Sequence, residues 1–361
     1  MNPQRVGRPS DGRFLPRAMQ SWLGLLPVLL LLAAGCATHP RPSPLNRFEF
    51  EAIEMAIPFR IVVYSADSQV ATNAARQAFA RIHGLNGQLS DYDPESELSR
   101  FSRTAGTGQS VPLSTELAAV LVRAQEVARE SDGAFDVTVG PLVQLWRRAR
   151  RQKEMPDPAR LSEASAAVGW GQLELRRTHG ATTAQFPFTG RLLKPGMRLD
   201  LGGIAKGYAL DEATRILRAH GLHRTLITGA GDMVAGDPPP GQPGWKIDLP
   251  PVEFPGAPPD QAVWLRRGAL CTSGDLFQYV EIDGQRYSHI VDPHTGLGLT
   301  DRGLVIVLGR DGMTTDALST ALSVLPTNQG LAVARKYRVE ARILRVPKGT
   351  LEANQTPNFP R

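Results

Sequence analysis

The chain has 361 residues, of which 42% are hydrophobic and 21% are charged, which is typical of one large or two smaller globular domains. The formal net charge is +6, but residues 1–35 hold four arginines and one aspartate (+3), so the rest carries only +3. Because the sequence also has no basic stripe interleaved with aromatic residues, we expect no nucleic-acid partner. Two cysteines are too few for a zinc site built from a cysteine cluster.

Residues 1–35 have the pattern of an export signal. Four arginines precede an apolar run from Trp22 to Ala34, which is too short for an ordinary membrane span. Small residues end this run directly before Cys36, as in bacterial lipoprotein signals, although Ala33 stands where that motif prefers leucine. We expect lipidation of Cys36 and a location on the periplasmic side of the inner or outer membrane. A plain cleaved signal and an uncleaved anchor are the alternatives.

The rest of the chain divides into a spacer, one domain and a tail. Residues 36–46 are proline-rich and polar, which indicates a semi-rigid spacer between membrane and domain. Residues 47–346 are predicted to form the domain, and residues 347–361 a disordered tail. If Cys36 carries lipid, Cys271 has no disulfide partner, so an exported domain of this kind depends on its hydrophobic core.

The first half of the domain shows both strand and helix patterns. Bulky and β-branched residues alternate within 47–64, which predicts one or two strands, and apolar residues recur every four positions over 67–85, which predicts a helix. The turn-rich stretch 89–98 is expected to be a loop. Ser114 can cap a helix that ends at Arg129. The remaining elements expected here are a helix from Pro141, strands at 170–175 and 198–201, and a helix over 205–220 ended by Gly221.

The second half is predominantly β. Short apolar stretches separated by glycine or proline predict strands, and the dipeptide Asp283-Gly284 predicts a tight hairpin turn. Strands and helices do not alternate strictly, so we expect an α+β fold with helices packed against antiparallel or mixed sheets. The strands expected are 224–227, 234–235, 245–249, 262–265, 277–282, 287–291, 304–308 and 341–346, and the helices are 313–325 and 328–336.

The stretch from Asp200 to Asp211 contains a carboxylate, two adjacent glycines and a lysine directly before an amphipathic pattern. Glycines at the start of a helix allow close approach of a ligand, and the first N–H groups of the helix attract anions. Lys206 adds a positive charge suited to phosphate. The alternative is a plain strand–turn–helix in which the lysine forms a salt bridge.

Two further blocks contain glycines, a histidine and carboxylates. Residues 228–236 superficially resemble a dinucleotide fingerprint, but the third glycine is misplaced and prolines follow where a helix should start, so a hairpin is favoured. His289 lies three residues before Asp292 in a turn-flanked segment, and it can be a structural histidine or a base. A serine hydrolase is disfavoured because the Gly-x-Ser-x-Gly elbow is missing.

The stretch 314–322 combines a carboxylate with hydroxyl groups on a predicted helix. Asp316 and Thr320 are four residues apart and share a face, and Ser319 lies beside them. Such hard oxygen ligands suit Mg²⁺ rather than zinc or copper. The alternative is that Asp316 caps the helix while Thr320 bonds to the preceding turn.

Taken in order, the blocks LSDYDPESELSRFS, GAFDVTVGPLVQLW, LDLGGIAKGYALD, ITGAGDMVAG, LCTSGDLFQYVEIDGQRYSHIVDPHTG and TTDALSTALSVL resemble the FAD:protein FMN transferases, the ApbE-type flavin transferases. The resemblance implies an α+β fold with FAD in a cleft between lobes and Mg²⁺ at its pyrophosphate. It also implies that the enzyme splits FAD, releases AMP and joins FMN to a threonine of another protein. The implied targets are flavin-carrying subunits of sodium-pumping quinone reductase or Rnf-type complexes, with an acceptor motif similar to Asp-Gly-x-Thr-Gly-Ala-Thr.

The resemblance also assigns roles to individual residues. This chain departs from the family pattern at three places. They are Ala56-Ile57 directly after Met55, Ser102 at the end of the first block, and Ser319 where the family can have aspartate, a stronger metal ligand. The matched FAD contacts are Met55, Tyr92, Ala134, Phe135, Asp136, Asp200, Lys206 and Val291, and the matched metal ligands are Gly203, Asp316, Ser319 and Thr320.

The expected reaction is displacement at a phosphorus atom of FAD by a threonine hydroxyl. Such transfers need positioning and charge neutralisation, which Mg²⁺ and Lys206 can supply. His289 is the first candidate for the general base, with Asp292 orienting it or replacing it. A Mg²⁺-dependent FAD pyrophosphatase and an exported flavin-binding lipoprotein without activity are the alternatives. Residues 228–231 and 311–316 supply only fragments of the acceptor motif, so another protein is the expected acceptor.

Overall fold

The computed structural model describes residues 44–178, 188–250, 261–275 and 278–360. They belong to one compact unit, Pro44–Arg361. The predicted export signal, Cys36 and most of the spacer lie outside the described residues. Among the helices of the described residues, none is long and apolar enough to cross a membrane.

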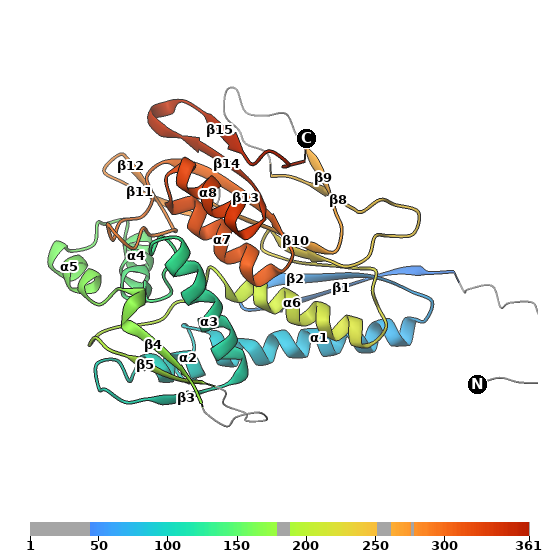
Figure 1. The fold of residues 1–361 in the computed structure, drawn as a ribbon, viewed down its shortest axis with the longest axis horizontal. Helices are drawn as coiled ribbons and strands as arrows, with labels where there is room; N and C mark the ends of the chain where they lie inside the picture. Colours follow the sequence, from blue (N-terminus) through green and yellow to red (C-terminus); the bar gives the residue numbers. More distant parts are fainter. Residues whose placement is uncertain (1–43, 179–187, 251–260, 276–277, 361) are drawn as a thin grey trace, which may run out of the picture. The chain divides into compact units, whose positions relative to one another are not determined.

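One large antiparallel sheet forms the centre of the described fold (Figure 1). Its ends are the β1–β2 pair and the β14–β15 pair, and β7 and β10 lie in the middle. The strands, in sheet order, are β1 (Asn46–Glu54), β2 (Ile57–Ser65), β6 (Thr225–Gly229), β7 (Asp232–Ala235), β10 (Gly268–Gly274), β13 (Arg302–Gly309), β14 (Glu340–Val346) and β15 (Glu352–Gln355).

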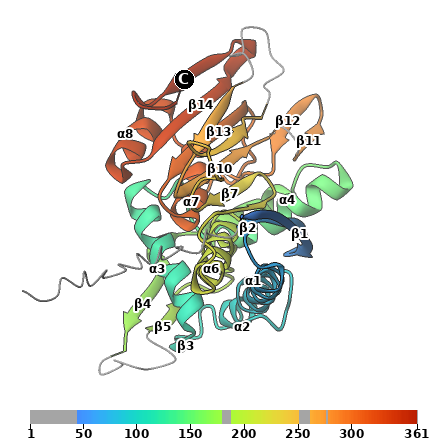
Figure 2. The ribbon, with the colours of Figure 1, turned by 90° about the vertical axis from the view of Figure 1, so that its right-hand side faces the viewer.

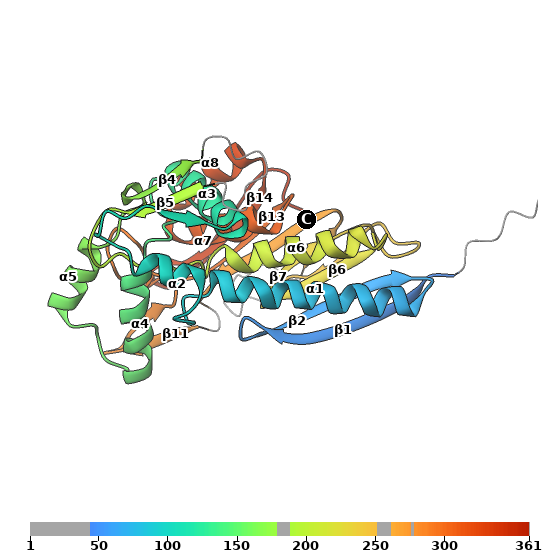
Figure 3. The same ribbon diagram turned by 90° about the horizontal axis from the view of Figure 1, so that it is seen from below.

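Helices cover one face of this sheet in the order of its strands (Figure 2). The main core lies between these helices and the sheet, because alanine and leucine side chains of α1, α6 and α7 pack on inward-facing residues such as Ile61 and Val63. Figure 3 shows α1 and α6 side by side, with α1 next to the β1–β2 hairpin. The helices that cover the sheet are α1 (Ser68–Leu89), α6 (Ala205–Ala219), α7 (Gly312–Val324) and α8 (Thr327–Tyr337), and α3 (Thr115–Glu130) packs on α1 and α7.

The opposite face of the sheet carries a second, smaller core. Val62, which alternates with the inward residues of β2, packs there with Trp245, Leu344 and Phe359. The hairpin of β8 (Trp245–Asp248) and β9 (Ala262–Leu265) supplies much of this cover. Because both faces of the sheet are buried, its central strands are almost continuously apolar.

A third cluster surrounds α4 (Gly140–Gln152), where Leu142 and Trp146 pack against β11 (Tyr279–Ile282) and β12 (Gln285–Ser288). The indole N–H of Trp146 donates to the carbonyl of Gly296 at 2.8 Å. The remaining elements are α2 (Glu97–Ser102), α5 (Pro158–Ala166), two short 3-10 turns (170–172 and 347–349) and the sheet of β3 (Val111–Leu113), β5 (Phe188–Leu192) and β4 (Leu173–Arg177).

The predicted α+β class with antiparallel sheets is confirmed, as are most predicted helices. Ser114 caps α3 by accepting from the N–H of Leu117 at 3.2 Å. Gly221 has φ +77° directly after α6, and Asp283 and Gly284 have φ +50° and +76° in the β11–β12 turn. These are conformations that favour glycine or aspartate.

Three local predictions are wrong, and a fourth, the loop 89–98, is too long by two residues at its end. The tail is ordered over the described residues 347–360, because β15 pairs with β14 and Phe359 is 2% exposed. The predicted loop 89–98 is confirmed over residues 90–96, and α2 begins at Glu97, where Ser96 Oγ caps it by accepting from Ser99 N. The predicted strand 198–201 is a single bridge from Arg198 to Val139, and the predicted strand 170–175 begins only at Leu173, after a 3-10 turn.

Candidate functional site

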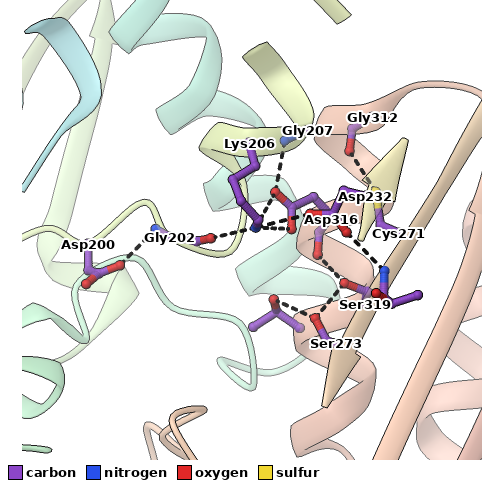
Figure 4. Close-up of polar contacts among 12 residues, drawn as sticks. Asp200, Gly202, Lys206, Gly207, Asp232, Cys271, Ser273, Gly312, Asp316 and Ser319 are labelled. Atoms are coloured by element: carbon purple, nitrogen blue, oxygen red, sulfur yellow. Dashed lines mark hydrogen bonds and ion pairs between the residues drawn. The ribbon is translucent and has the colours of Figure 1, made fainter. Parts of the chain in front are cut away.

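The centre of the candidate site is the ammonium group of Lys206, at the start of α6 (Figure 4). Its Nζ lies 3.2 Å from Oδ2 of Asp232 and 3.2 Å from Oδ1 of Asp316, and it donates to the carbonyl of Gly202 at 3.1 Å. Burial alone would lower the pKa of Lys206, but the charges of Asp316 and Asp232 raise it well above its usual range. Lys206 is therefore a permanent cation between two buried carboxylates.

Asp316 and Asp232 are each 1% exposed and reach Lys206 from different elements. Asp316, on α7, also accepts from the backbone N–H of Gly207 at 3.0 Å. Asp232 begins β7 and accepts through Oδ1 from the N–H of Thr272 at 3.0 Å. Burial and the charge of Asp316 raise the pKa of Asp232 to about 6, against the opposing charge of Lys206. The sequence did not identify Asp232, although a carboxylate in a buried strand is a recognisable signal.

Close packing of α6 on α7 brings these groups together. A Cβ on Gly207 would lie 2.1 Å from the carbonyl oxygen of Gly312, so only glycine allows the two backbones to meet. Asp211 of α6 then accepts from the first N–H groups of α7, at 2.7 Å from Gly312 and 2.9 Å from Met313. Asp311 caps α7 by accepting from Thr314 N at 2.8 Å. This arrangement fixes the position of α7 relative to Lys206.

Hydroxyl groups extend the site along α7. Ser319 Oγ lies 2.7 Å from Ser273 Oγ of β10, and Thr320 Oγ1 lies 3.5 Å from the same oxygen. A Cβ on Gly203 would be 2.8 Å from Thr320 Oγ1, so the backbone of Gly203 lies directly against that hydroxyl. The structure therefore brings together all the residues that the sequence predicted as metal ligands, and adds Ser273.

The chemistry of this donor set fits Mg²⁺. Asp316 contributes a carboxylate, Ser319 and Thr320 contribute hydroxyls, and the Gly202–Gly203 turn contributes carbonyl oxygens, which are the hard ligands that Mg²⁺ prefers. Within the described ranges, no group of three or more histidine, cysteine or acidic side chains could hold a metal. Cys271 is buried beside this set, and burial raises the pKa of its thiol, so it stays protonated.

A second part of the site is a network of charges around Asp200. Its Oδ1 accepts from the N–H of Gly202 at 2.8 Å, and its Oδ2 accepts from Nη2 of Arg147 at 2.8 Å. Arg147 also pairs with Asp91, and its guanidinium lies 4.1 Å from the centre of the Tyr92 ring. Burial and the charge of Asp91 raise the pKa of Asp200, while Arg147 opposes this shift. Arg147 and Asp91 were not among the predicted site residues.

The predicted contacts at 134–136 follow α3 and are buried. Phe135 donates its N–H to Ser131 Oγ at 3.1 Å, and its ring lies beside Gly203, so two predicted contact regions meet there. Asp136 accepts from Thr138 N and Thr138 Oγ1, each at 2.7 Å, and burial raises its pKa. The Asp136 carboxylate therefore stabilises the turn in which it lies.

The two remaining predicted FAD contacts lie in other elements. Met55 is at the β1–β2 turn with φ +49°, next to Ala56 with φ +61°, and its half-buried side chain packs on the main core. Val291 is 7% exposed, packs in the α4 cluster and forms a bridge with Gly298.

His289 and Asp292 are close in sequence but have different partners. Nδ1 of His289 lies 3.1 Å from the carbonyl oxygen of Gln278. Asp292 instead accepts from His294 N at 2.9 Å and from Thr295 Oγ1 at 3.1 Å, which closes a turn. Burial lowers the pKa of His289, with smaller contributions from the charges of Arg150 and Lys206. The group that orients His289 is thus the Gln278 carbonyl, whereas Asp292 was the expected partner.

The chain is similar to one protein family along most of its length. The ApbE family profile matches residues 55–343. An FAD:protein FMN transferase of Treponema pallidum is 30% identical over 87% of this chain and 88% of that protein. An FAD:protein FMN transferase of Haemophilus influenzae is 32% identical over 73% of this chain and 76% of that protein.

Solved structures show the same fold. The flavin transferase ApbE from Vibrio cholerae superposes with a TM-score of 0.75 and 27% identity, covering 88% of this chain and 99% of that one. The apo flavinyl transferase ApbE of Pseudomonas stutzeri superposes with a TM-score of 0.74 and 26% identity, covering 87% of this chain and 96% of that one.

Proposed function

The chain belongs to the ApbE family, and on this premise we propose that it is a transferase that moves FMN from FAD to a threonine hydroxyl of a target protein and releases AMP. The observation that carries the proposal is the meeting of Lys206, Asp316 and the Gly202–Gly203 turn at the start of α6. A cation, hard oxygen ligands and a helix N-terminus together form a site for a diphosphate.

We propose that Mg²⁺ is held by Asp316, Ser319, Thr320 and the carbonyl of Gly203. When bound, it would neutralise the diphosphate and polarise the phosphorus–oxygen bond that breaks. Asp232 would keep Lys206 in position and charged if the Asp316 carboxylate bound a metal ion, because the two form a separate ion pair. Asp232 is thus the counter-charge that keeps Lys206 in the site.

The transfer exchanges the phosphoanhydride bond of FAD for a phosphate ester bond to the threonine. The threonine oxygen attacks the phosphorus of the FMN half, the anhydride bond breaks, and AMP leaves with the bridging oxygen. The hydroxyl proton passes to His289: its Nδ1–H donates to the Gln278 carbonyl, which leaves Nε2 as the acceptor. The lowered pKa of His289 keeps the imidazole neutral, and therefore able to take a proton, near pH 7.

Incubation of the purified protein with FAD, Mg²⁺ and an acceptor that carries Asp-Gly-x-Thr-Gly-Ala-Thr tests the proposal. Covalent flavin fluorescence on the acceptor in a denaturing gel supports transfer. Free FMN and AMP with an unlabelled acceptor would instead identify a pyrophosphatase. Tight retention of intact FAD without AMP release would identify a flavin-binding protein without this activity.

We propose that the enzyme acts outside the cytoplasm, held to a membrane by lipid on Cys36, on flavin-carrying subunits of membrane redox complexes. The basic, short apolar segment that ends directly before Cys36 supports this location. Replacement Cys36→Ser tests it. The variant should lose label from a radioactive fatty acid and leave the membrane fraction, and unchanged labelling would refute the lipid anchor.

A further inference from the structure

Arg147 joins two segments of the candidate site that are more than a hundred residues apart. Its Nη1 pairs with Asp91, and its Nη2 donates to Oδ2 of Asp200 at 2.8 Å. The same guanidinium lies 4.1 Å from the centre of the Tyr92 ring. One side chain on α4 therefore contacts the loop after α1 and the segment that leads into the Gly202–Gly203 turn.

These contacts are sheltered from water. The side chain of Arg147 is 17% exposed, and those of Asp91 and Asp200 are 15% and 9% exposed. A planar guanidinium can bind two carboxylates with separate N–H groups while it stacks on an aromatic ring. A lysine at this position would keep the positive charge, but it would lack the several N–H donors in fixed geometry and the planar surface of a guanidinium.

The Tyr92 ring stacks on this guanidinium. Tyr92 is 75% exposed, so its other ring face is free to take a second planar group. Asp200 carries the connection onward, because its Oδ1 accepts from Gly202 N at 2.8 Å, beside the carbonyl that Lys206 binds. A shift of Arg147 would therefore move the Tyr92 ring together with the Gly202–Gly203 turn, which is called the diphosphate turn below.

We propose that Arg147 is a positioning residue of the FAD site, which holds Tyr92 against the flavin ring and Asp200 beside the diphosphate turn. The inference rests on the proposed function, since it concerns how FAD is held. It predicts that Arg147 and Tyr92 act as one unit in FAD binding, although they lie on different elements.

Titration of FAD fluorescence with Mg²⁺ present tests the proposal in the full chain. Arg147→Gln should weaken FAD binding at least tenfold and reduce the quenching of the flavin. Arg147→Lys should restore the melting temperature, because it keeps a cation between Asp91 and Asp200, but not the quenching. Arg151→Gln, an exposed arginine on the same helix, is the matched control and should bind FAD as the unmodified protein does.

A double-mutant cycle with Tyr92→Ala provides the second readout. If Arg147 acts through Tyr92, the combined loss of FAD affinity should be well below the product of the two single losses. Unchanged flavin quenching in Arg147→Gln would overturn the inference, and so would single losses of FAD affinity that multiply in the double variant. In both cases, FAD binding by the unmodified protein would leave the proposed function unaffected. Failure of the unmodified protein to bind FAD would overturn both.

Discussion

At the residue scale, His289 is the group whose replacement separates binding from chemistry. Its Nδ1 is engaged by the Gln278 carbonyl, so the proton of the attacking hydroxyl can reach only Nε2. We expect His289→Gln to lower kcat by ~10²–10⁴-fold, the usual contribution of a general base, with little change in FAD affinity. Single-turnover rates and FAD titration measure the two quantities. An unchanged kcat would assign His289 a structural role.

Ser319 is one of the three departures of this chain from the family pattern, and the one among the predicted metal ligands. It is fully buried, and its Oγ donates to the carbonyl of Asp316 at 2.8 Å. A neutral hydroxyl binds Mg²⁺ more weakly than a carboxylate does. We therefore expect Ser319→Asp to lower the Mg²⁺ concentration at half-maximal activity by about tenfold, the equivalent of ~1.4 kcal/mol.

The control for this variant is Ser323→Asp, one turn further along α7, which should leave the Mg²⁺ requirement unchanged. An unchanged requirement in Ser319→Asp would contradict the assignment of Ser319 as a metal ligand.

Individual site residues could be predicted where several residues suited to ligand binding stand close together in the sequence. Lys206 and Asp316 stand in blocks with glycines or hydroxyls, and the structure brings them within 3.2 Å of each other. Arg147 could not be found in this way, because it acts through Asp91 and Asp200, which are distant in sequence, and nothing near it distinguishes a site residue from a surface charge. Asp232 carried the signal of a carboxylate in a buried strand, but its partner Lys206 lies on another element, so its role became clear only in the structure.

At the element scale, the α6–α7 junction predicts a pH effect on stability. Burial raises the pKa of Asp211 from 3.8 to about 7, against the hydrogen bonds from Gly312 and Met313. The folded state therefore holds a proton that the unfolded chain loses above about pH 4. This contribution is fully present below about pH 4 and is lost as the pH rises through about 7, by up to ~4 kcal/mol.

Replacement of Asp211 by asparagine tests this effect. Denaturant unfolding of both proteins between about pH 4 and 7 should show that the stability advantage of the unmodified protein shrinks as the pH rises. Asp67→Asn, at the exposed N-terminus of α1, is the control for loss of a capping carboxylate. A constant difference between the unmodified protein and Asp211→Asn would contradict the raised pKa of Asp211.

Helices whose apolar residues repeat regularly along the sequence were predicted well, whereas short elements were not. The helices α1, α3 and α6 each bury one apolar face that repeats along the sequence. By contrast, β15 has the exposed sequence Glu-Ala-Asn-Gln and forms only because it pairs with β14. Its order comes from tertiary contact, which local pattern does not encode.

At the scale of the whole molecule, the sheet is buried on both faces, and the chain end closes the second core. Phe359 is 2% exposed and packs in that core, under the guanidinium of Arg342 at 4.4 Å from the ring centre. We expect Phe359→Ala to lower the free energy of unfolding by ~3–5 kcal/mol, because the core cannot fully collapse around the lost ring. Asn358→Ala, exposed beside it, should change stability by less than ~0.5 kcal/mol. A loss no larger than that of the control would mean that the tail does not stabilise the fold.

The central claim is that a protein hydroxyl, and not water, accepts the FMN half of FAD. The most direct test mixes the enzyme, Mg²⁺ and FAD with a limiting amount of acceptor. It then measures the AMP released and the flavin bound covalently to the acceptor. Transfer predicts one AMP for each flavinylated acceptor, a stop when the acceptor is consumed, and no AMP with an acceptor whose motif threonine is replaced by alanine. AMP release that continues after the acceptor is consumed, or proceeds without it at the same rate, would contradict the account.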